Sequence, residues 1–241
     1  MFGLGVIINT LSVLAGGIVG MFFGKYIKES LQHAVVMGCG VATIFIGAGG
    51  TLAHMLVVDN GQLGTRDSLL LIFSLVIGIV IGELLRIEDR MDNVAEKIKK
   101  LMKAENDNKF VDGFVTVSLI ICVGAMAIVG SIQDGITGDY SMIAAKSVLD
   151  FAIVIVFAAT YGLGATCSAI AIFVYQGLIT VVAHFAGSFV SEELMGYLSY
   201  VGSALIFCVG INICFGKRFK VGNMLPSLLI PVAYIVIKSY I

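Results

Sequence analysis

The sequence contains no tryptophan, two prolines and few charged residues. Asp, Glu, Lys and Arg make up 13% of its 241 residues, whereas soluble domains carry about 25%. Because so little charge cannot cover a water-facing surface, a soluble globular protein is excluded. The net charge of −1 provides no basic surface, so we expect no nucleic-acid partner.

Signatures of catalysis and metal binding are also missing. No Walker loop, HExxH or GxSxG motif occurs, and the three histidines are widely separated in sequence. The five cysteines lie within apolar stretches and form no CxxC pair, which indicates neither a disulfide framework nor a metal site. We therefore expect a protein that is not an enzyme and that carries no cofactor and no metal.

The chain has instead a high content of long apolar runs. Its hydrophobic residues make up 59% of the total, and its mean hydropathy is +1.02. The runs are about 20 residues long, as a helix needs to cross a bilayer. They predict an all-α polytopic membrane protein, a single integral membrane domain over 1–241 with about eight spans near 4–24, 34–57, 68–85, 112–133, 141–160, 164–187, 194–216 and 222–240.

Two of these spans are less regular than the others. Only residues 161–163 separate the fifth span from the sixth, so a broken or re-entrant segment is an open alternative there. The last span contains Asn223, Pro226 and Pro231. Because each proline frees a backbone carbonyl, we expect this helix to be kinked or discontinuous, and freed carbonyls can coordinate cations.

Basic residues predict the orientation, since they gather in cytoplasmic loops. Placing the loop after the third span inside puts 12 of the 15 Lys and Arg on that side. We therefore expect a membrane protein with both termini outside. The long loop 86–109 has apolar residues at helical spacing, which predicts an amphipathic helix on the inner membrane face. A lipid-anchored connector and a regulatory helix are both compatible with it.

Ionisable residues within spans are the first candidates for function, because charge in a bilayer is costly. Lys146 and Asp150 lie four residues apart in the fifth span, so they share a helix face. Asp150 is expected about 13 Å deep, near the midplane. The pair, with Ser147 between its members, is either a substrate or ion site or a self-neutralising structural pair.

Further polar residues complete the candidate set. Asn9 and Asn212 are expected to add amide groups to the lining of the Lys146/Asp150 site. Glu83 ends the third span as an interfacial carboxylate, or acts as a gate or proton acceptor. Asp134 and Asp139 lie in a turn that leads to Lys146; they either serve the turn or attract cations to the mouth of the site.

Two sequence patterns bear on assembly. Gly16, Gly20 and Gly24 line one face of the first span and allow close helix approach, within the protein or in a homodimer. The segments 23–28 (FGKYIK) and 215–220 (FGKRFK) resemble each other. They suggest a parallel internal repeat, a feature of many secondary transporters, although so short a match also arises by coincidence.

These residues resemble a bacterial inner-membrane family called domain of unknown function 554, over nearly the whole chain. The resemblance rests on four blocks: Asn9 with Gly16, Gly17 and Gly20; Gly78 with Ile81-Gly82-Glu83; Gly138-Asp139 with the segment Ala145 to Phe151; and Asn223 to Pro226. It implies a cytoplasmic-membrane protein of a type described as a candidate transporter, without an established substrate.

The function predicted from these patterns is secondary transport of a small solute or ion, with Lys146 and Asp150 at the binding or coupling site. A structural or lipid-binding membrane module and an ion channel are the alternatives. The expected partners are membrane lipid and an unidentified small solute or ion.

Overall fold

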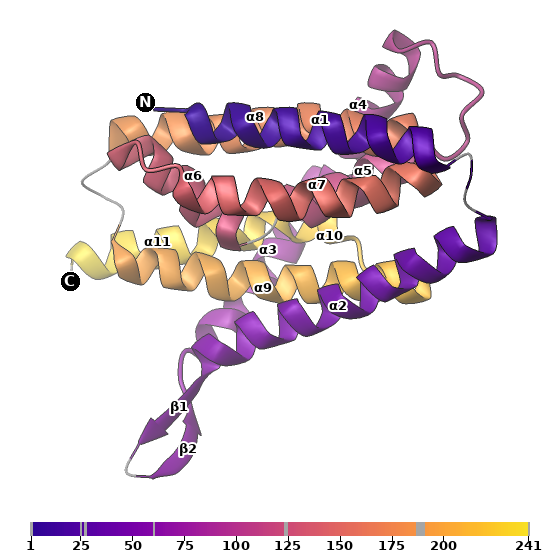
Figure 1. The fold of residues 1–241 in the computed structure, drawn as a ribbon. Helices are drawn as coiled ribbons and strands as arrows, with labels where there is room; N and C mark the ends of the chain where they lie inside the picture. Colours follow the sequence, from indigo (N-terminus) through magenta and orange to yellow (C-terminus); the bar gives the residue numbers. More distant parts are fainter. Residues whose placement is uncertain are drawn as a thin grey trace.

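The computed structural model describes residues 2–24, 26, 28–59, 61–122, 125–186 and 191–240. The described elements are helices joined by short connections, apart from one small β-hairpin (Figure 1). In chain order they are α1 Leu4–Gly24, α2 Glu29–Met55, β1 Leu56–Asp59, β2 Gln62–Thr65, α3 Ser68–Leu85, α4 Ile87–Leu101, α5 Phe110–Cys122, α6 Ala125–Thr137, α7 Ser141–Tyr161, α8 Leu163–Ala186, α9 Glu192–Phe215, α10 Val221–Met224, the 3₁₀ turn η2 Leu225–Leu228 and α11 Leu229–Tyr240. Lys25 and Ile27 of the first repeat-like segment, and residue 187 of the sixth predicted span, lie outside the described residues.

The predicted fold class is confirmed. Within the described ranges, 7 helices are long and apolar enough to cross a membrane, or 8 spans if the bent pair α5 and α6 counts as one. The last span is discontinuous, as its prolines predict: α10 passes into the 3₁₀ turn η2 before α11 continues. Pro226 lies in η2, where its missing N–H leaves no helical hydrogen bond unmade.

The fourth span differs from the continuous helix that hydropathy predicts. Helices α5 and α6 lie at 61° to each other, and residues 123 and 124 of the predicted span lie outside the described residues. A bend changes the direction of a helix but not the hydropathy of its residues, so the sequence pattern does not reveal it. By contrast, α7 and α8 are two complete helices. Between them, Gly162 adopts a φ of 59°, which is open to glycine at no steric cost and which allows the abrupt reversal.

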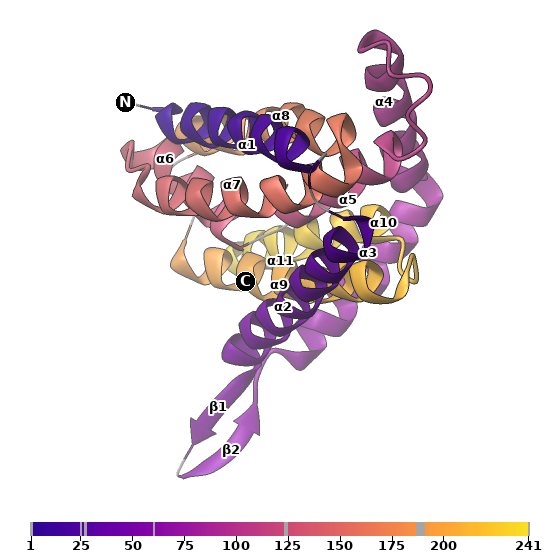
Figure 2. The same ribbon diagram turned by 45° about the vertical axis from the view of Figure 1, so that its right-hand side comes forward.

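The second predicted span ends earlier than expected, and a β-hairpin follows it. Helix α2 stops at Met55, and β1 pairs antiparallel with β2. Val57 and Val58 are β-branched and favour a strand, and Gly61 before β2 has a φ of 77°. The hairpin projects away from the helices (Figure 2).

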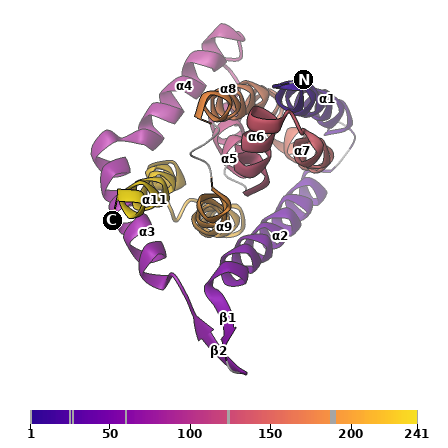
Figure 3. The same ribbon diagram turned by 90° about the vertical axis from the view of Figure 1, so that its left-hand side faces the viewer.

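The helices pack in two groups, as the view from the end that carries both termini shows (Figure 3). In one group α1 packs against α7 and α8, and α8 also packs against α5 and α6. In the other, α2 packs against α9, and α3 packs against α10, η2 and α11. Contacts of α6 with α9 and of α2 with α7 join the groups.

The predicted amphipathic helix of the loop 86–109 corresponds to α4. Ala95 is fully buried, and Met91 and Ile98 pack against the same hydrophobic cluster. Val94 and Leu101 on the remaining surface are exposed. Much of the apolar face of α4 therefore contacts the protein rather than lipid.

The two chain termini lie at one end of the molecule (Figure 1). The opposite end carries α4 and residues 216–220, and we call it the basic end. There Lys217 forms an ion pair with Glu88 at 2.5 Å, and Lys220 forms one with Glu83 at 3.1 Å. The position of both termini at one end agrees with an even number of spans.

Candidate binding site

The centre of the site is the ion pair of Lys146 with Asp150 on α7. The Lys146 ammonium donates to Oδ2 of Asp150, one helical turn away. Both residues are buried; Asp150 lies near the middle of α7, and Lys146 lies one turn closer to its start. Burying two charges is costly unless they are paired and hydrogen-bonded, so the pair needs further polar partners.

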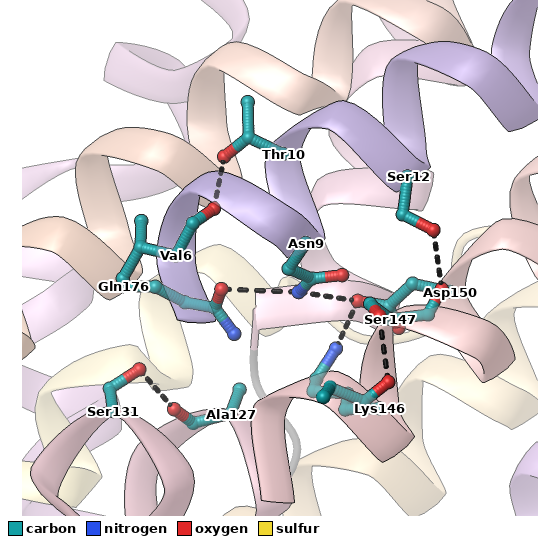
Figure 4. Close-up of polar contacts among 11 residues, drawn as sticks. Val6, Asn9, Thr10, Ser12, Ala127, Ser131, Lys146, Ser147, Asp150 and Gln176 are labelled. Carbon is teal, nitrogen blue, oxygen red and sulfur yellow. Dashed lines mark hydrogen bonds and ion pairs between the residues drawn. The ribbon is translucent and has the colours of Figure 1, made fainter. Parts of the chain in front are cut away.

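Helix α1 supplies one of these partners because its glycines allow it to approach α7 closely. A Cβ atom at Gly16 would lie 2.7 Å from the carbonyl oxygen of Phe151, and one at Gly20 would overlap the carbonyl of Ile155. The close approach brings the fully buried Asn9 to the ion pair. Its Nδ2 donates to Oδ2 of Asp150 at 3.0 Å and to Oε1 of Gln176 on α8 at 3.1 Å (Figure 4).

The direction of these bonds determines how both amides are oriented. A carboxylate only accepts, so Asn9 must present its NH₂ group to Asp150. Gln176 must then present its oxygen to that same NH₂ group. This leaves the Asn9 Oδ1 and the Gln176 Nε2 without a hydrogen-bond partner among the described residues, although both are buried. We call Lys146, Asp150, Asn9 and Gln176 the polar cluster.

Ser147, predicted as a member of the site, has a different role. Its hydroxyl donates to the carbonyl of Ala144 at 2.7 Å, within its own helix. Its carbonyl accepts from the hydroxyl of Ser12 at 2.9 Å. Ser147 therefore helps to join α7 to α1 beside the polar cluster.

Asn212 does not join the polar cluster, contrary to the expectation from its depth in a span. Its Oδ1 accepts from the backbone N–H groups of Arg218 and Phe219 at 2.8 and 2.9 Å, and its Nδ2 donates to the carbonyl of Phe219 at 2.7 Å. The chain folds back after α9, and Asn212 satisfies the backbone of that turn. Both polar atoms of its side chain are thus used in hydrogen bonds at the basic end.

The two carboxylates of the turn before Lys146 satisfy helix ends. Asp134 is fully buried, and its two oxygens accept from the N–H groups of Gly3 and Gly5 at 3.2 and 3.1 Å, at the start of α1. Asp139 is exposed and accepts from the N–H of Ser141 at 3.0 Å, at the start of α7. This bond and the one from the Ser141 hydroxyl lower the pKa of Asp139. These contacts support the structural interpretation of both residues.

Glu83 also lies apart from the polar cluster, at the exposed end of α3, where it pairs with Lys220. Close by, Asn223 is buried, and its Oδ1 accepts from the backbone N–H of Glu88 at 2.7 Å. The buried Glu88 in turn accepts from the N–H of Gly222 at 3.1 Å and pairs with Lys217. The first turns of α4 and α10 therefore cap each other. The hydrogen bond to Glu88 raises the pKa of Lys217.

A cavity of about 480 Å³ lies at the basic end. Glu88, Asp92, Asp112 and Lys217 are among its lining residues, and Leu119 lines it from α5. Burial raises the pKa of Asp92, and the neighbouring carboxylates add to this effect. Lys146 and Asp150 are not among the lining residues.

Comparisons with known proteins place the chain in a family. The model of the family described as protein of unknown function (DUF554) matches residues 4–236. The chain belongs to this family. It is 33% identical to the uncharacterized membrane protein YdfK of Bacillus subtilis, over 94% of this chain and 93% of that protein. It is 28% identical to the uncharacterized protein YqgA of Escherichia coli, over 94% of each chain. No solved structure matches.

The fold explains several residues that carry the resemblance to DUF554. A Cβ atom at Gly78 or Gly82 would overlap Ser227 or the backbone of Asn223, so these glycines let α3 lie directly against η2 and α10. The blocks around residues 82 and 223 therefore form one contact. Lys146 and Asp150 form the polar cluster with Asn9, whose own block is the glycine face of α1.

Sequence reasoning in this DUF554 protein missed two residues. Gln176 was recognisable only as a polar residue at depth, because its bond to Asn9 joins residues 167 positions apart. In the sequence, Glu88 was recognisable only as an acidic residue in the first turn of a helix, and such residues are usually exposed. Its burial depends on the position of α10.

We expect Glu88→Gln to lower the free energy of unfolding by about 1–2 kcal/mol, because it removes the charge that pairs with Lys217 and weakens the bond to Gly222. The thermal midpoint Tm of the detergent-purified protein should fall by about 2–4 °C per kcal/mol. Glu96→Gln, the same change at an exposed position of α4, is the control. Equal Tm values for the two variants would contradict the mutual capping of α4 and α10.

Proposed function

We propose that this protein is a secondary transporter of a small solute or ion and that the polar cluster is its binding or coupling site. The observation that supports this is the neutral, buried ion pair within a membrane-spanning helix, with Asp150 near the helix middle. Asn9 bonds to Asp150 and to Gln176, and each of these amides has one polar atom without a partner among the described residues. Ionisable groups at such depth are expensive and typically mark substrate or ion pathways. Unpaired buried amide atoms are equally uncommon.

The helix arrangement has features that suit transport. In the group that holds the cluster, α5 and α6 lie at 61° to each other, and in the other group the 3₁₀ turn η2 interrupts the last span. Broken helices at membrane depth are common where transporters bind substrates. The cavity at the basic end reaches Leu119, and Cys122, one turn further along α5, packs in the same hydrophobic cluster as Val13 and Val154. We propose that this cluster closes the path between the cavity and the site.

The excess of Lys and Arg leads us to propose that the basic end faces the cytoplasm of a bacterial inner membrane and that both termini lie outside. The function proposed is not enzymatic. We do not propose a homodimer through the glycine face of α1, because Gly16, Gly17 and Gly20 are buried against α7 and α8. That face is closed to a second copy of the chain.

Asp150→Asn is expected to reduce transport at least about tenfold, since loss of a buried, hydrogen-bonded charge costs several kcal/mol and each 1.4 kcal/mol is a factor of ten. Proteoliposomes on a solid-supported membrane would be exposed to jumps of amino acids, organic acids, sodium, potassium and protons, and the currents recorded. Asp59→Asn makes the same chemical change on the exposed hairpin and should leave the currents intact.

Two results would overturn the proposal. One is a wild-type protein that gives no current with any of these probes, and the other is an Asp150→Asn variant that transports normally. If the exchange Lys146→Asp with Asp150→Lys restores stability while no solute produces a current, the pair is a structural lock. The protein would then be a structural or lipid-binding module.

A further inference from the structure

The unpaired NH₂ group of Gln176 is the most informative atom of the polar cluster. Gln176 is fully buried, its oxygen is already occupied by Asn9, and its Nε2 has no partner among the described residues. Figure 4 shows this nitrogen and the Lys146 ammonium on the same side of the row of hydrogen bonds, next to α6. Two hydrogen-bond donors, one of them charged, thus border the same region.

Helix α6 lies beside Gln176. The hydroxyl of Thr180 on α8 donates to the carbonyl of Ser131 at 3.1 Å, and Nδ1 of His184 lies 3.0 Å from the carbonyl of Gly135. Thr180 and His184 are four residues apart on α8, and their partners Ser131 and Gly135 are four residues apart on α6. The same spacing, continued four residues back along both helices, places Gln176 level with Ala127. Ala127 belongs to α6.

The amide NH₂ group of Gln176 thus has no hydrogen-bond acceptor among the described residues. The Lys146 ammonium has three N–H groups, and Asp150 accepts from it. Both groups favour the same kind of ligand atom, an anionic oxygen.

We propose that Gln176 and Lys146, beside α6, form a subsite for the carboxylate group of a transported solute. This inference rests on the proposed function and specifies the class of its substrate. A bare metal cation does not suit the subsite, because it would face an ammonium and an amide NH₂ group.

Charge balance limits what can accompany the carboxylate. The pair of Lys146 with Asp150 is neutral, so an added carboxylate would leave one uncompensated negative charge in a buried site. The compensating charge is either the solute's own ammonium group or a proton taken up with it. In the first case, the unpaired Oδ1 of Asn9, which points toward Asp150 in Figure 4, offers an acceptor to the ammonium. A zwitterionic amino acid and a simple carboxylic acid are therefore the two sources of the group.

The test is the Tm of the detergent-purified full chain with acetate, propionate, glycine, alanine or ethylammonium, each at matched ionic strength against sodium chloride. A ligand of the folded state raises the Tm by about 3–6 °C at about ten times its Kd. We expect this rise with acetate and propionate or with glycine and alanine, and not with ethylammonium or sodium chloride. If acetate and propionate raise the Tm, the carboxylate belongs to a simple carboxylic acid; if glycine and alanine raise it, the carboxylate belongs to an amino acid.

Gln176→Met keeps the size of the side chain and removes the donor, so it should abolish the rise. Thr180→Val removes a neighbouring contact between α8 and α6 and should retain it. If Gln176→Met does not fold, Gln176→Glu keeps the oxygen that accepts from Asn9 and places a negative charge where the carboxylate would bind. It should abolish the rise as well.

A rise with ethylammonium or sodium alone, or an equal rise in the Gln176 variants, would overturn the carboxylate subsite. So would no rise with any carboxylate. The currents of the same proteoliposomes separate this failure from that of the proposed function. If only cations drive a current in the wild-type protein and Asp150→Asn abolishes it, the protein is a transporter without the carboxylate subsite. Carboxylate binding without current would leave the subsite without transport.

Discussion

Replacing Lys146 with methionine is expected to lower the free energy of unfolding by about 3–5 kcal/mol, because the carboxylate of Asp150 would remain buried without its counter-ion. At about 2–4 °C per kcal/mol, the Tm should fall by roughly 10 °C. Methionine has nearly the length of lysine, so lost packing contributes little. The bond from Asn9 to Asp150 remains, but it cannot neutralise the charge.

The double variant Lys146→Met with Asp150→Leu removes both charges and should recover most of the lost stability, since replacing a buried pair by apolar residues is often neutral. Lys238→Met is the matched control. It breaks an ion pair with Glu193 whose side chains are exposed, and such pairs contribute little. A Lys146→Met variant as stable as this control would contradict a buried ion pair.

Gly82→Ala is expected to destabilise the protein by about 3 kcal/mol, because the added Cβ atom would overlap the backbone of Asn223 rather than a movable side chain. Helix α3 would have to move away from α10, which would also disturb the bond from Glu88 to Asn223. The Tm of the purified variant measures this effect. Its fall should approach that of Lys146→Met.

Gly49→Ala in α2 is the control for Gly82→Ala, and its effect should have the opposite sign. Apart from its chain neighbours and its own helix backbone, no described residue has an atom within 4 Å of a Cβ atom placed at Gly49. Alanine there favours the helix and should leave stability unchanged or raise it by up to about 1 kcal/mol. If both substitutions are equally well tolerated, α3 does not lie against α10 as closely as the structure has it.

Transport and stability depend differently on the polar cluster. Asp150→Asn keeps the size of the side chain and tests the role of its charge in binding. It also leaves the Lys146 ammonium buried without its counter-ion, so its currents are compared at equal amounts of folded protein. Lys146→Met tests the cost of an unpaired charge. A structural lock predicts large stability effects without any response to solutes, whereas a transporter site predicts both.

The number of spans, the discontinuity of the last span and the pairing of Lys146 with Asp150 could be predicted from the sequence. Each depends on residues that are near one another in the chain. Hydropathy over about 20 residues determines whether a helix can cross a bilayer, a proline removes its own N–H, and positions four apart share a helix face. No knowledge of the neighbouring helices is needed for any of them.

The other parts of the site depended on the tertiary structure. Asn9 and Asn212 look alike in sequence, as buried amides within spans, but the glycine face of α1 brings only Asn9 to Asp150, while Asn212 satisfies the turn after α9. Glu88 and Gln176 acquire their roles from helices more than a hundred residues away. Local patterns determine which segments form helices, whereas hydrogen bonds and close packing between distant helices decide which polar side chains meet.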